Sequence, residues 1–445
     1  MRLRIKEIAQ HVGGSVLVDG TAASIADAEF DGATQDSRAL QPGQLFVPLI
    51  AERNGHDFIP GALDKGAAAY FSSESPAAGT AIVVEDTMAA LSAAGSFARS
   101  KVEGPVIGIT GSVGKTSTKD LLAGALSTSR PTHASTKSFN NEIGVPLTLL
   151  NTPDDAEAVV LEMGARGIGH IAELCAVASP TVGIVTTVAG AHVGEFGSID
   201  NIALAKGELV ESLPPEGLAV LNAGNPYVAD MASRTSAQVL SFGVAGVGQD
   251  SNADVMVRSI SLDDELRATF TLDTEWGEVV ATPQTRGSHM AENVAAAVAA
   301  ALWLGCTVEQ VERGIAQSAV SPWRMEVFRS ASGALVINDS YNANPTSMIG
   351  AIDSLVQLDA DRKIAVVGYM AELGESEVEA HQGIAERLES QGVEVIAVGT
   401  DLYGHACVVE PLDARSLLDG LDETWAVLIK GSRSAGLEAL ADALR

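Results

Sequence analysis

The fold of this chain is decided by residues 106–116, which read VIGITGSVGKT. Residues 106–110 form a short apolar run typical of a buried strand, and residues 118–126 are expected to be helical. A Gly-x-x-Gly-Lys-Thr turn between a strand and a helix directs backbone N–H groups and the helix dipole at a phosphate group. The stretch therefore predicts a phosphate-binding loop at one edge of a parallel α/β sheet.

In such a loop the lysine reaches the β- and γ-phosphate oxygens and the threonine hydroxyl faces Mg²⁺. One spacing differs from the common pattern, because Ile109 stands six residues before Lys115, where a glycine is usual. A glycine turn that binds nothing is the alternative. The residues predicted to hold the nucleotide phosphates are Gly111, Ser112, Val113, Gly114, Lys115, Thr116 and Ser117.

Strand-like runs continue on both sides of the loop. Residues 158–161 and 182–188 are apolar and each is followed by a helix-like stretch, which predicts a mostly parallel sheet. A second α/β series has strands near 334–337, 364–367, 393–398 and 427–429. We therefore expect an α/β protein of three domains: a small α/β domain (1–103), a central parallel-sheet ATPase domain (104–319) and a doubly wound, Rossmann-like domain (320–445).

Composition excludes several classes of protein. The 445 residues carry a formal net charge of −29, which disfavours nucleic acid and anionic membranes as partners. Three distant cysteines predict neither a disulfide framework nor a structural zinc site. The start of the chain does not resemble a signal peptide, and the most apolar stretch, 294–306, is too short to span a bilayer. We expect a soluble cytoplasmic protein.

Three further residues could hold metal ions. Glu162 ends the apolar run 158–161, where an open parallel sheet forms its ligand crevice, and His192 follows the next strand. Lys206 lies in a predicted helix, 201–209. Each has an ordinary alternative: a surface glutamate, a structural histidine and a solvated lysine.

The segment 337–345, INDSYNANP, ends a strand in Asp339 and continues into a polar turn stopped by proline. Asp339 could bind a ribose hydroxyl, and the asparagines could bind a base or backbone groups. A helix N-terminus without a ligand is equally compatible with this pattern.

Taken together, these motifs resemble the Mur ligase family over nearly the whole chain. The shifted glycine spacing around the loop is also what this family shows. The motifs that carry the resemblance are DSR (36–38), LFVPL (45–49), NGHDF (54–58), GITGSVGKT (108–116), FNNEIGVP (139–146), EMG (162–164), AH with FG (191–192, 196–197), AKGE (205–208), His289 with Asn293, RME (324–326), DSYNANP (339–345) and ELG (372–374).

The resemblance implies roles for these residues. Asn293, Arg324 and Asp339 would contact ATP. Thr116, Glu162, His192 and a carbamylated Lys206 would hold two Mg²⁺ ions, and Lys115, Lys206 and His192 would be catalytic. Substrate would be bound by Asp36, Ser37, Arg38, Asn140, Asn141, Tyr341, Asn342 and Asn344.

The segment 341–345 and the ELG motif favour the branch that adds D-alanyl-D-alanine to UDP-N-acetylmuramoyl-tripeptide through an acyl phosphate. The resemblance then implies that residues 1–103 bind the UDP-sugar and residues 320–445 bind the dipeptide. Such an enzyme would act as a monomer in peptidoglycan synthesis. Two positions depart from the family: Thr187 replaces an asparagine, and Tyr369 replaces an aspartate. Another Mur-type or folylpolyglutamate-synthase-like ligase, or an inactive ATP-binding regulator, are the alternatives.

Overall fold

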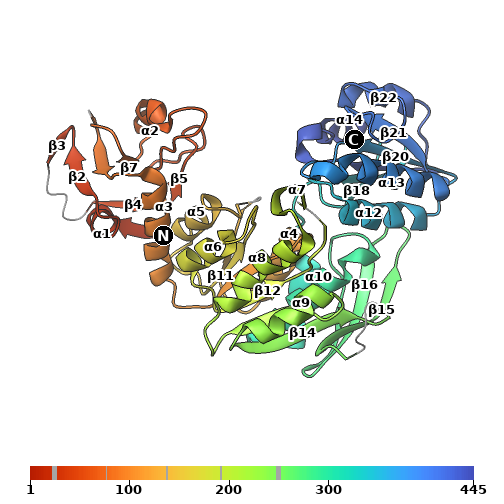
Figure 1. The fold of residues 1–445 in the computed structure, drawn as a ribbon, viewed down its shortest axis with the longest axis horizontal. Helices are drawn as coiled ribbons and strands as arrows, with labels where there is room; N and C mark the ends of the chain where they lie inside the picture. Colours follow the sequence, from red (N-terminus) through yellow and green to blue (C-terminus); the bar gives the residue numbers. More distant parts are fainter. Residues whose placement is uncertain (23–27, 77, 137–138, 191–192, 247–251) are drawn as a thin grey trace.

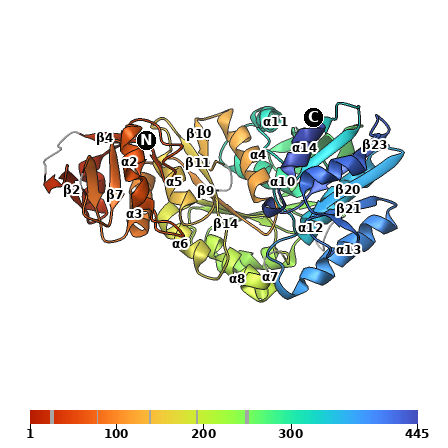
Figure 2. The ribbon, with the colours of Figure 1, turned by 90° about the horizontal axis from the view of Figure 1, so that it is seen from above.

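The computed structural model describes residues 1–22, 28–76, 78–136, 139–190, 193–246 and 252–445. Three large sheets follow one another along the described chain, and each is accompanied by helices (Figure 1). The first and third lie at opposite ends of the molecule with the second between them, as Figure 2 also shows. The α/β class predicted from the sequence is confirmed.

The N-terminal sheet has the order β3-β2-β8-β7-β6-β5, and a separate pair joins β1 and β4. Strands β5 to β8 run parallel, whereas β2 and β3 are antiparallel additions. The elements are β1 (Arg2–Arg4), α1 (Ile5–His11), β2 (Ser15–Val18), β3 (Thr21–Ala22), β4 (Glu29–Asp31), β5 (Ala33–Thr34), β6 (Leu45–Phe46), η1 (Gly55–Phe58), α2 (Ile59–Asp64), β7 (Ala69–Ser72), β8 (Thr80–Val83) and α3 (Thr87–Ser100).

The central sheet has the order β10-β11-β9-β12-β13-β14-β15-β16-β17. It is parallel from β10 to β15, and β16 and β17 add an antiparallel edge that the sequence did not predict. Its strands are β9 (Val106–Thr110), β10 (Thr132–Ala134), β11 (Ala158–Glu162), β12 (Val182–Val185), β13 (Leu218–Asn222), β14 (Gln238–Val244), β15 (Val255–Leu262), β16 (Ala268–Thr274) and β17 (Gly277–Ala281).

Helices cover both faces of this sheet because alternate strand residues point to opposite sides. Val159 and Leu161 of β11 join the apolar cluster of α5, α6 and α8, whereas Val160 joins that of α4, α10 and α11. The helices are α4 (Lys115–Ser127), α5 (Gly144–Leu150), α6 (His170–Ala178), α7 (Val193–Phe196), α8 (Ile199–Glu211), α9 (Pro226–Ala229), η2 (Asp230–Arg234), η3 (Ser288–Met290), α10 (Ala291–Trp303) and α11 (Val308–Gln317).

The C-terminal sheet has the order β18-β19-β23-β20-β21-β22 and is parallel except for β18. Separate apolar clusters fill its two faces. The elements are β18 (Glu326–Arg329), β19 (Leu335–Asp339), α12 (Pro345–Gln357), β20 (Arg362–Gly368), η4 (Gly374–Ser376), α13 (Glu377–Ser390), β21 (Glu394–Val398), β22 (Cys407–Val408), η5 (Pro411–Leu418), β23 (Trp425–Lys430), η6 (Arg433–Ala435) and α14 (Glu438–Leu444).

The N-terminal part is packed tightly against the centre. Helix α3 lies on α5 and α6, and a Cβ atom added to Gly95 would come within 2.6 Å of Pro146. One continuous apolar cluster runs through both parts. The predicted boundaries near 103 and 319 fall between the sheets, in the connections that follow α3 and α11.

The apolar stretch 294–306 is largely the buried helix α10, as predicted. No helix in the described ranges combines the length and the apolar character needed to cross a bilayer.

Candidate active site

The candidate site lies at the carboxyl ends of β9, β11 and β12, where the loop 111–114 leads into α4. Gly111 and Gly114 have φ values of +153° and +86°. A Cβ on Gly111 would lie 1.9 Å from Oγ1 of Thr186, and one on Gly114 would lie 2.2 Å from Oδ1 of Asn293. Only glycine fits these two positions, because the loop backbone passes so close to Thr186 and Asn293.

The loop is fixed by the segment that follows β12. The N–H of Ser112 donates to the carbonyl of Thr187 (2.8 Å), and its hydroxyl donates to the carbonyl of Ala189 (3.0 Å). The hydroxyl of Thr186 donates to the carbonyl of Val113 (2.6 Å). The side chain of Thr187, the residue that departs from the family, accepts a hydrogen bond from Asn225 (3.0 Å). Hydrogen bonds from the segment after β12 therefore hold the loop in place.

Lys115 begins α4 and is partly buried, and its Nζ donates to the carbonyl of Gly111 (2.7 Å). Burial lowers the pKa of Lys115, whereas the negative charge of Glu162 opposes that shift. Arg324 and Glu372 of the C-terminal part also act on this pKa, in opposite directions. Residues of two sheets thus surround one ammonium group.

Thr116 and Glu162 form the core of a candidate magnesium site. The Thr116 hydroxyl donates to Oε2 of Glu162 (2.7 Å), and the amide of Asn140 donates to Oε1 (2.9 Å). The backbone N–H of Glu162 donates to the hydroxyl of Ser135 (3.2 Å). Both proposed ligands are buried, at 5% and 2% exposure, so Glu162 is not a surface residue. Hydroxyl and carboxylate oxygens are ligands that Mg²⁺ accepts.

His192, predicted as a further ligand, lies outside the described residues. Among those that are described, no three His, Cys, Asp or Glu side chains gather as a metal cluster. Among the described residues, Glu162 is the carboxylate that contacts the Thr116 hydroxyl directly.

Lys206 lies in α8 and is only 4% exposed, so the alternative of a solvated lysine is wrong. Burial lowers its pKa well below 10.5, and the positive charge of Lys115 lowers it further. A lowered pKa favours the neutral amine, which is the form that reacts with carbon dioxide.

Asn293, Arg324 and Asp339 come from different elements. Asn293, in the first turn of α10, accepts a hydrogen bond from the Thr118 hydroxyl (3.3 Å). The guanidinium of Arg324 lies 4.1 Å above the ring of Tyr341, and within the described residues its buried Nε has no hydrogen-bond partner. Oδ1 of Asp339 accepts from the N–H of Met325 (3.0 Å).

Lys430 was missed by the sequence analysis. It is 1% exposed, pairs with Oδ2 of Asp339 and donates to the carbonyl of Asn342 (2.9 Å). Its signal was a charged residue directly after the apolar run 427–429, at the same sheet edge as Asp339. Lys430 thereby fixes both Asp339 and the following polar turn.

The predicted substrate residues fall into three places. Asp36 and Arg38 form a two-point ion pair near β5, which lowers the pKa of Asp36, and Ser37 stands between them. Oδ1 of Asn141 accepts the N–H groups of Ile143 and Gly144 just before and at the start of α5, and Asn344 caps α12. The helix-cap alternative is therefore correct for the Asn344 side chain, while its role in substrate binding stays a prediction.

Tyr369, the second departure from the family, forms a hydrogen bond with Glu377 and stacks on His381, with ring centroids 5.6 Å apart. His381 in turn accepts the N–H of Met370 (2.9 Å). The tyrosine thus belongs to a packed polar cluster at the start of α13.

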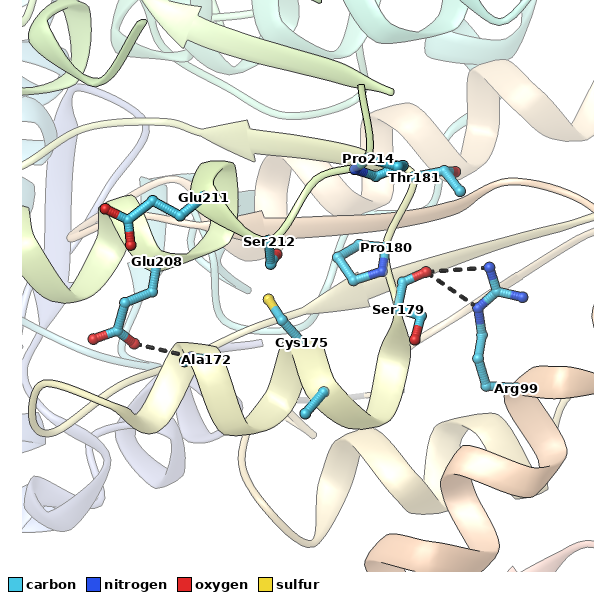
Figure 3. Close-up of a pocket in the computed structure, with 11 residues that line it drawn as sticks. Arg99, Ala172, Cys175, Ser179, Pro180, Thr181, Glu208, Glu211, Ser212 and Pro214 are labelled. Carbon is cyan, nitrogen blue, oxygen red and sulfur yellow. Dashed lines mark hydrogen bonds between the residues drawn. The ribbon is translucent and has the colours of Figure 1, made fainter. Parts of the chain in front are cut away.

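A separate pocket lies at the opposite, amino-terminal edge of the central sheet, between α6, α8 and α3 (Figure 3). Its polar groups are already engaged: Glu208 accepts N–H groups at the start of α6, and Arg99 donates to the carbonyl of Ser179. Burial raises the pKa of Cys175 to about 11, which keeps the thiol protonated. This pocket is not the candidate active site.

Two family models match the chain. The Mur ligase middle domain matches residues 109–301, and the Mur ligase, glutamate ligase domain matches residues 323–443.

Two relatives that align with this chain over nearly their full length are both named as the same ligase. A UDP-N-acetylmuramoyl-tripeptide--D-alanyl-D-alanine ligase of Mycobacterium tuberculosis is 36% identical, with 100% of this chain and 98% of that protein covered. The Escherichia coli ligase of that name is 33% identical, with 94% and 95% covered.

Solved structures of MurF have the same fold as this chain. MurF from Acinetobacter baumannii superposes with a TM-score of 0.89 at 30% identity, covering 100% of this chain and 99% of that one. MurF from Thermotoga maritima in complex with ADP gives 0.77 at 26% identity, covering 93% and 96%.

Proposed function

Because this chain belongs to the Mur ligase family, we propose that it joins D-alanyl-D-alanine to UDP-N-acetylmuramoyl-tripeptide in peptidoglycan synthesis, with ATP as the phosphoryl donor. One observation carries the proposal at the level of the site: a glycine loop, a lysine and a threonine–glutamate pair meet at one sheet edge, beside a buried lysine.

The reaction needs activation because a carboxylate is a poor electrophile. The terminal carboxylate of the tripeptide attacks the γ-phosphorus of ATP, and ADP leaves. The amine of the dipeptide then attacks the resulting acyl phosphate, and a tetrahedral intermediate collapses to the amide and inorganic phosphate. Phosphoryl transfer mainly requires positioning and charge neutralisation, which fixed side chains supply.

The residues fit that requirement. The loop 111–117 binds phosphate oxygens through backbone N–H groups, and the Lys115 ammonium offsets their negative charge. Arg324, whose buried Nε has no hydrogen-bond partner among the residues that the structure describes, offers a second cation from the C-terminal side. Asn293 stands beside Gly114 to meet the adenosine end, and Asp339 contacts the nucleotide from β19.

Two Mg²⁺ ions complete the proposal. Thr116 and Glu162 would hold the first, with His192. Carbamylation would convert Lys206 from a cation to an anion that helps to hold the second. The lowered pKa of Lys206 supports this step, because the neutral amine is the nucleophile. When bound, the ions would polarise the transferred phosphoryl group.

We assign the UDP end of the substrate to residues 1–103, ATP to residues 104–319 and the dipeptide to residues 320–445. Asp36, Ser37 and Arg38 would contact the UDP-sugar. Asn140 and Asn141 would contact the tripeptide, and Tyr341, Asn342 and Asn344 would contact the dipeptide. The enzyme would work in the cytoplasm as a monomer.

The test is phosphate release with UDP-N-acetylmuramoyl-tripeptide and ATP, with and without D-alanyl-D-alanine. We expect phosphate and ADP to accumulate only when both substrates are present, together with the UDP-pentapeptide. Release with a folate and glutamate instead would favour a folylpolyglutamate-synthase-like activity. ATP binding without turnover on any acceptor would contradict the assignment of a ligase.

A further inference from the structure

The linker between the central and C-terminal sheets is held in an unusual backbone conformation. Trp323 and Met325, on either side of Arg324, have φ values of +60° and +48°. Residues other than glycine rarely adopt this left-handed backbone conformation, so surrounding contacts must hold these two residues in it. Arg324 is the residue whose placement depends on them.

Contacts with the C-terminal sheet hold one side of the linker. Tyr341 donates its N–H to the carbonyl of Trp323 (3.1 Å), and the two rings stack with centroids 6.5 Å apart. The guanidinium of Arg433 lies over the ring of Trp323, 4.3 Å from its centre. The N–H of Met325 donates to Asp339 (3.0 Å).

One carboxylate of the central part holds the other side. Both the N–H and the hydroxyl of Ser321 donate to Oδ2 of Asp120, at 3.2 and 2.6 Å. Only Pro322, with its restricted φ, separates this anchor from Trp323. If the central and C-terminal sheets rotate relative to each other, the backbone must change conformation within a very short segment of the linker.

The second oxygen of the same carboxylate points back toward the metal site. Oδ1 of Asp120 pairs with Nζ of Lys119 (2.8 Å), and both side chains are largely buried. Lys119 also donates to the carbonyl of Ser135 (2.8 Å), whose hydroxyl accepts the backbone N–H of Glu162. A continuous set of polar contacts therefore joins Glu162 to Ser321.

We propose that Asp120 is a positioning residue: through Ser321 it fixes the linker, so that Arg324 is presented to the nucleotide bound at Lys115 and Glu162. This inference rests on the proposed function. A purely structural ion pair on α4 would instead stabilise the fold without affecting nucleotide affinity.

The chain contains a matched control. Asp254 accepts the N–H and the hydroxyl of Ser241 with one oxygen, at 2.7 and 2.6 Å. This pair has the same chemistry as Asp120 and Ser321, but it joins β14 to the residue before β15, and within the described residues the hydrogen bonds of Asp254 all go to Ser241. Asp254→Asn and Ser241→Ala therefore control for Asp120→Asn and Ser321→Ala.

The measurement is calorimetric titration of each full-length variant with Mg·ADP, together with its melting temperature. We expect weaker binding by about threefold for Ser321→Ala, in which the backbone N–H still donates to Asp120, and about tenfold for Asp120→Asn, the lower end of what losing a hydrogen bond to a charged group implies. The two control variants should bind like the wild type. The double variant Asp120→Asn/Ser321→Ala should be no weaker than Asp120→Asn, because both changes weaken the same contact between residues 120 and 321.

Two results would overturn the inference. The first is a lowered melting temperature with unchanged Mg·ADP affinity in both linker variants. The second is full additivity in the double variant, which would mean that Asp120 does not act through Ser321. Should Asp120→Asn fail to fold, Ser321→Ala alone decides by the same criterion. A wild type that binds Mg·ADP but releases no phosphate would contradict the proposed function and leave this test intact.

Discussion

The hydroxyl of Thr116 donates a 2.7 Å hydrogen bond to the carboxylate of Glu162, across 46 residues of sequence. Parallel pairing of β9 with β11 brings them together, because it aligns the carboxyl ends of the two strands. The loop that follows β9 then places Thr116 one residue into α4.

Replacement of Lys115 by alanine should abolish turnover and leave the fold intact. The change removes a charge-assisted contact to phosphate, of the kind that contributes about 1.5–3 kcal/mol. ADP formation and the circular dichroism spectrum are the measurements. Near-normal turnover would refute the assignment of the loop.

Glu162→Gln should raise the Mg²⁺ concentration needed for half-maximal activity by roughly tenfold. The amide keeps an oxygen that can accept from Thr116 but loses the charge that attracts the cation. A Mg²⁺ titration of phosphate release measures the shift. Glu142→Gln, an exposed change near α5, is the control and should leave the titration unchanged.

Lys206→Arg should eliminate activity, and added bicarbonate should not restore it, because arginine keeps a positive charge and forms no carbamate. Wild-type enzyme freed of carbon dioxide should lose activity and regain it with bicarbonate. Carbamylation would be excluded if wild-type turnover did not change with bicarbonate and the mass spectrum showed an unmodified Lys206.

Lys206 should also give a pH dependence of stability. The pKa of Lys206 in the folded chain is well below 10.5, the value expected in the unfolded chain. At a pH between these two pKa values, the unfolded chain binds more protons than the folded chain. The free energy of unfolding therefore rises as the pH increases through that window. Compared with Lys206→Met in carbon-dioxide-free buffer, the wild type should gain relative stability toward pH 10.5. Urea unfolding at several pH values measures this difference, and parallel curves would contradict the shift.

Binding of both an ATP analogue and the UDP-tripeptide should compact the molecule. A single compact body of this length has a radius of gyration of about 22 Å, and the free enzyme should exceed it. Gly194→Ala should hinder the compaction, since its Cβ would lie 2.8 Å from the backbone of Gly374 across the two parts. Small-angle scattering is the measurement, and Gly383→Ala is the control, because its Cβ would meet no described atom within 4 Å outside the neighbouring backbone of its own helix. Superposable free and liganded profiles would refute closure.

The α/β class and the strand, glycine loop and helix of residues 106–126 could be predicted from the sequence alone. Apolar runs of strand length, glycines with a following Lys-Thr, and a charged residue directly after a strand are local signals. The strand around β9 and the helix after it were predicted because backbone geometry and side-chain burial there depend on near neighbours. The motifs 108–116, 162–164 and 205–208 were also close enough to a known family to indicate a ligase.

Only the tertiary structure decided which of these residues meet. Whether Lys206 was solvated or buried could not be read from its helix, because the answer depends on packing against other elements. The position of Lys430 after an apolar run signals a strand end but not its partner Asp339, and nothing local signals the contact of Asp120 with Ser321. Their importance arises from a sheet order and a domain contact that bring distant residues within hydrogen-bond distance, and pairwise geometry of that kind is not encoded in any local pattern.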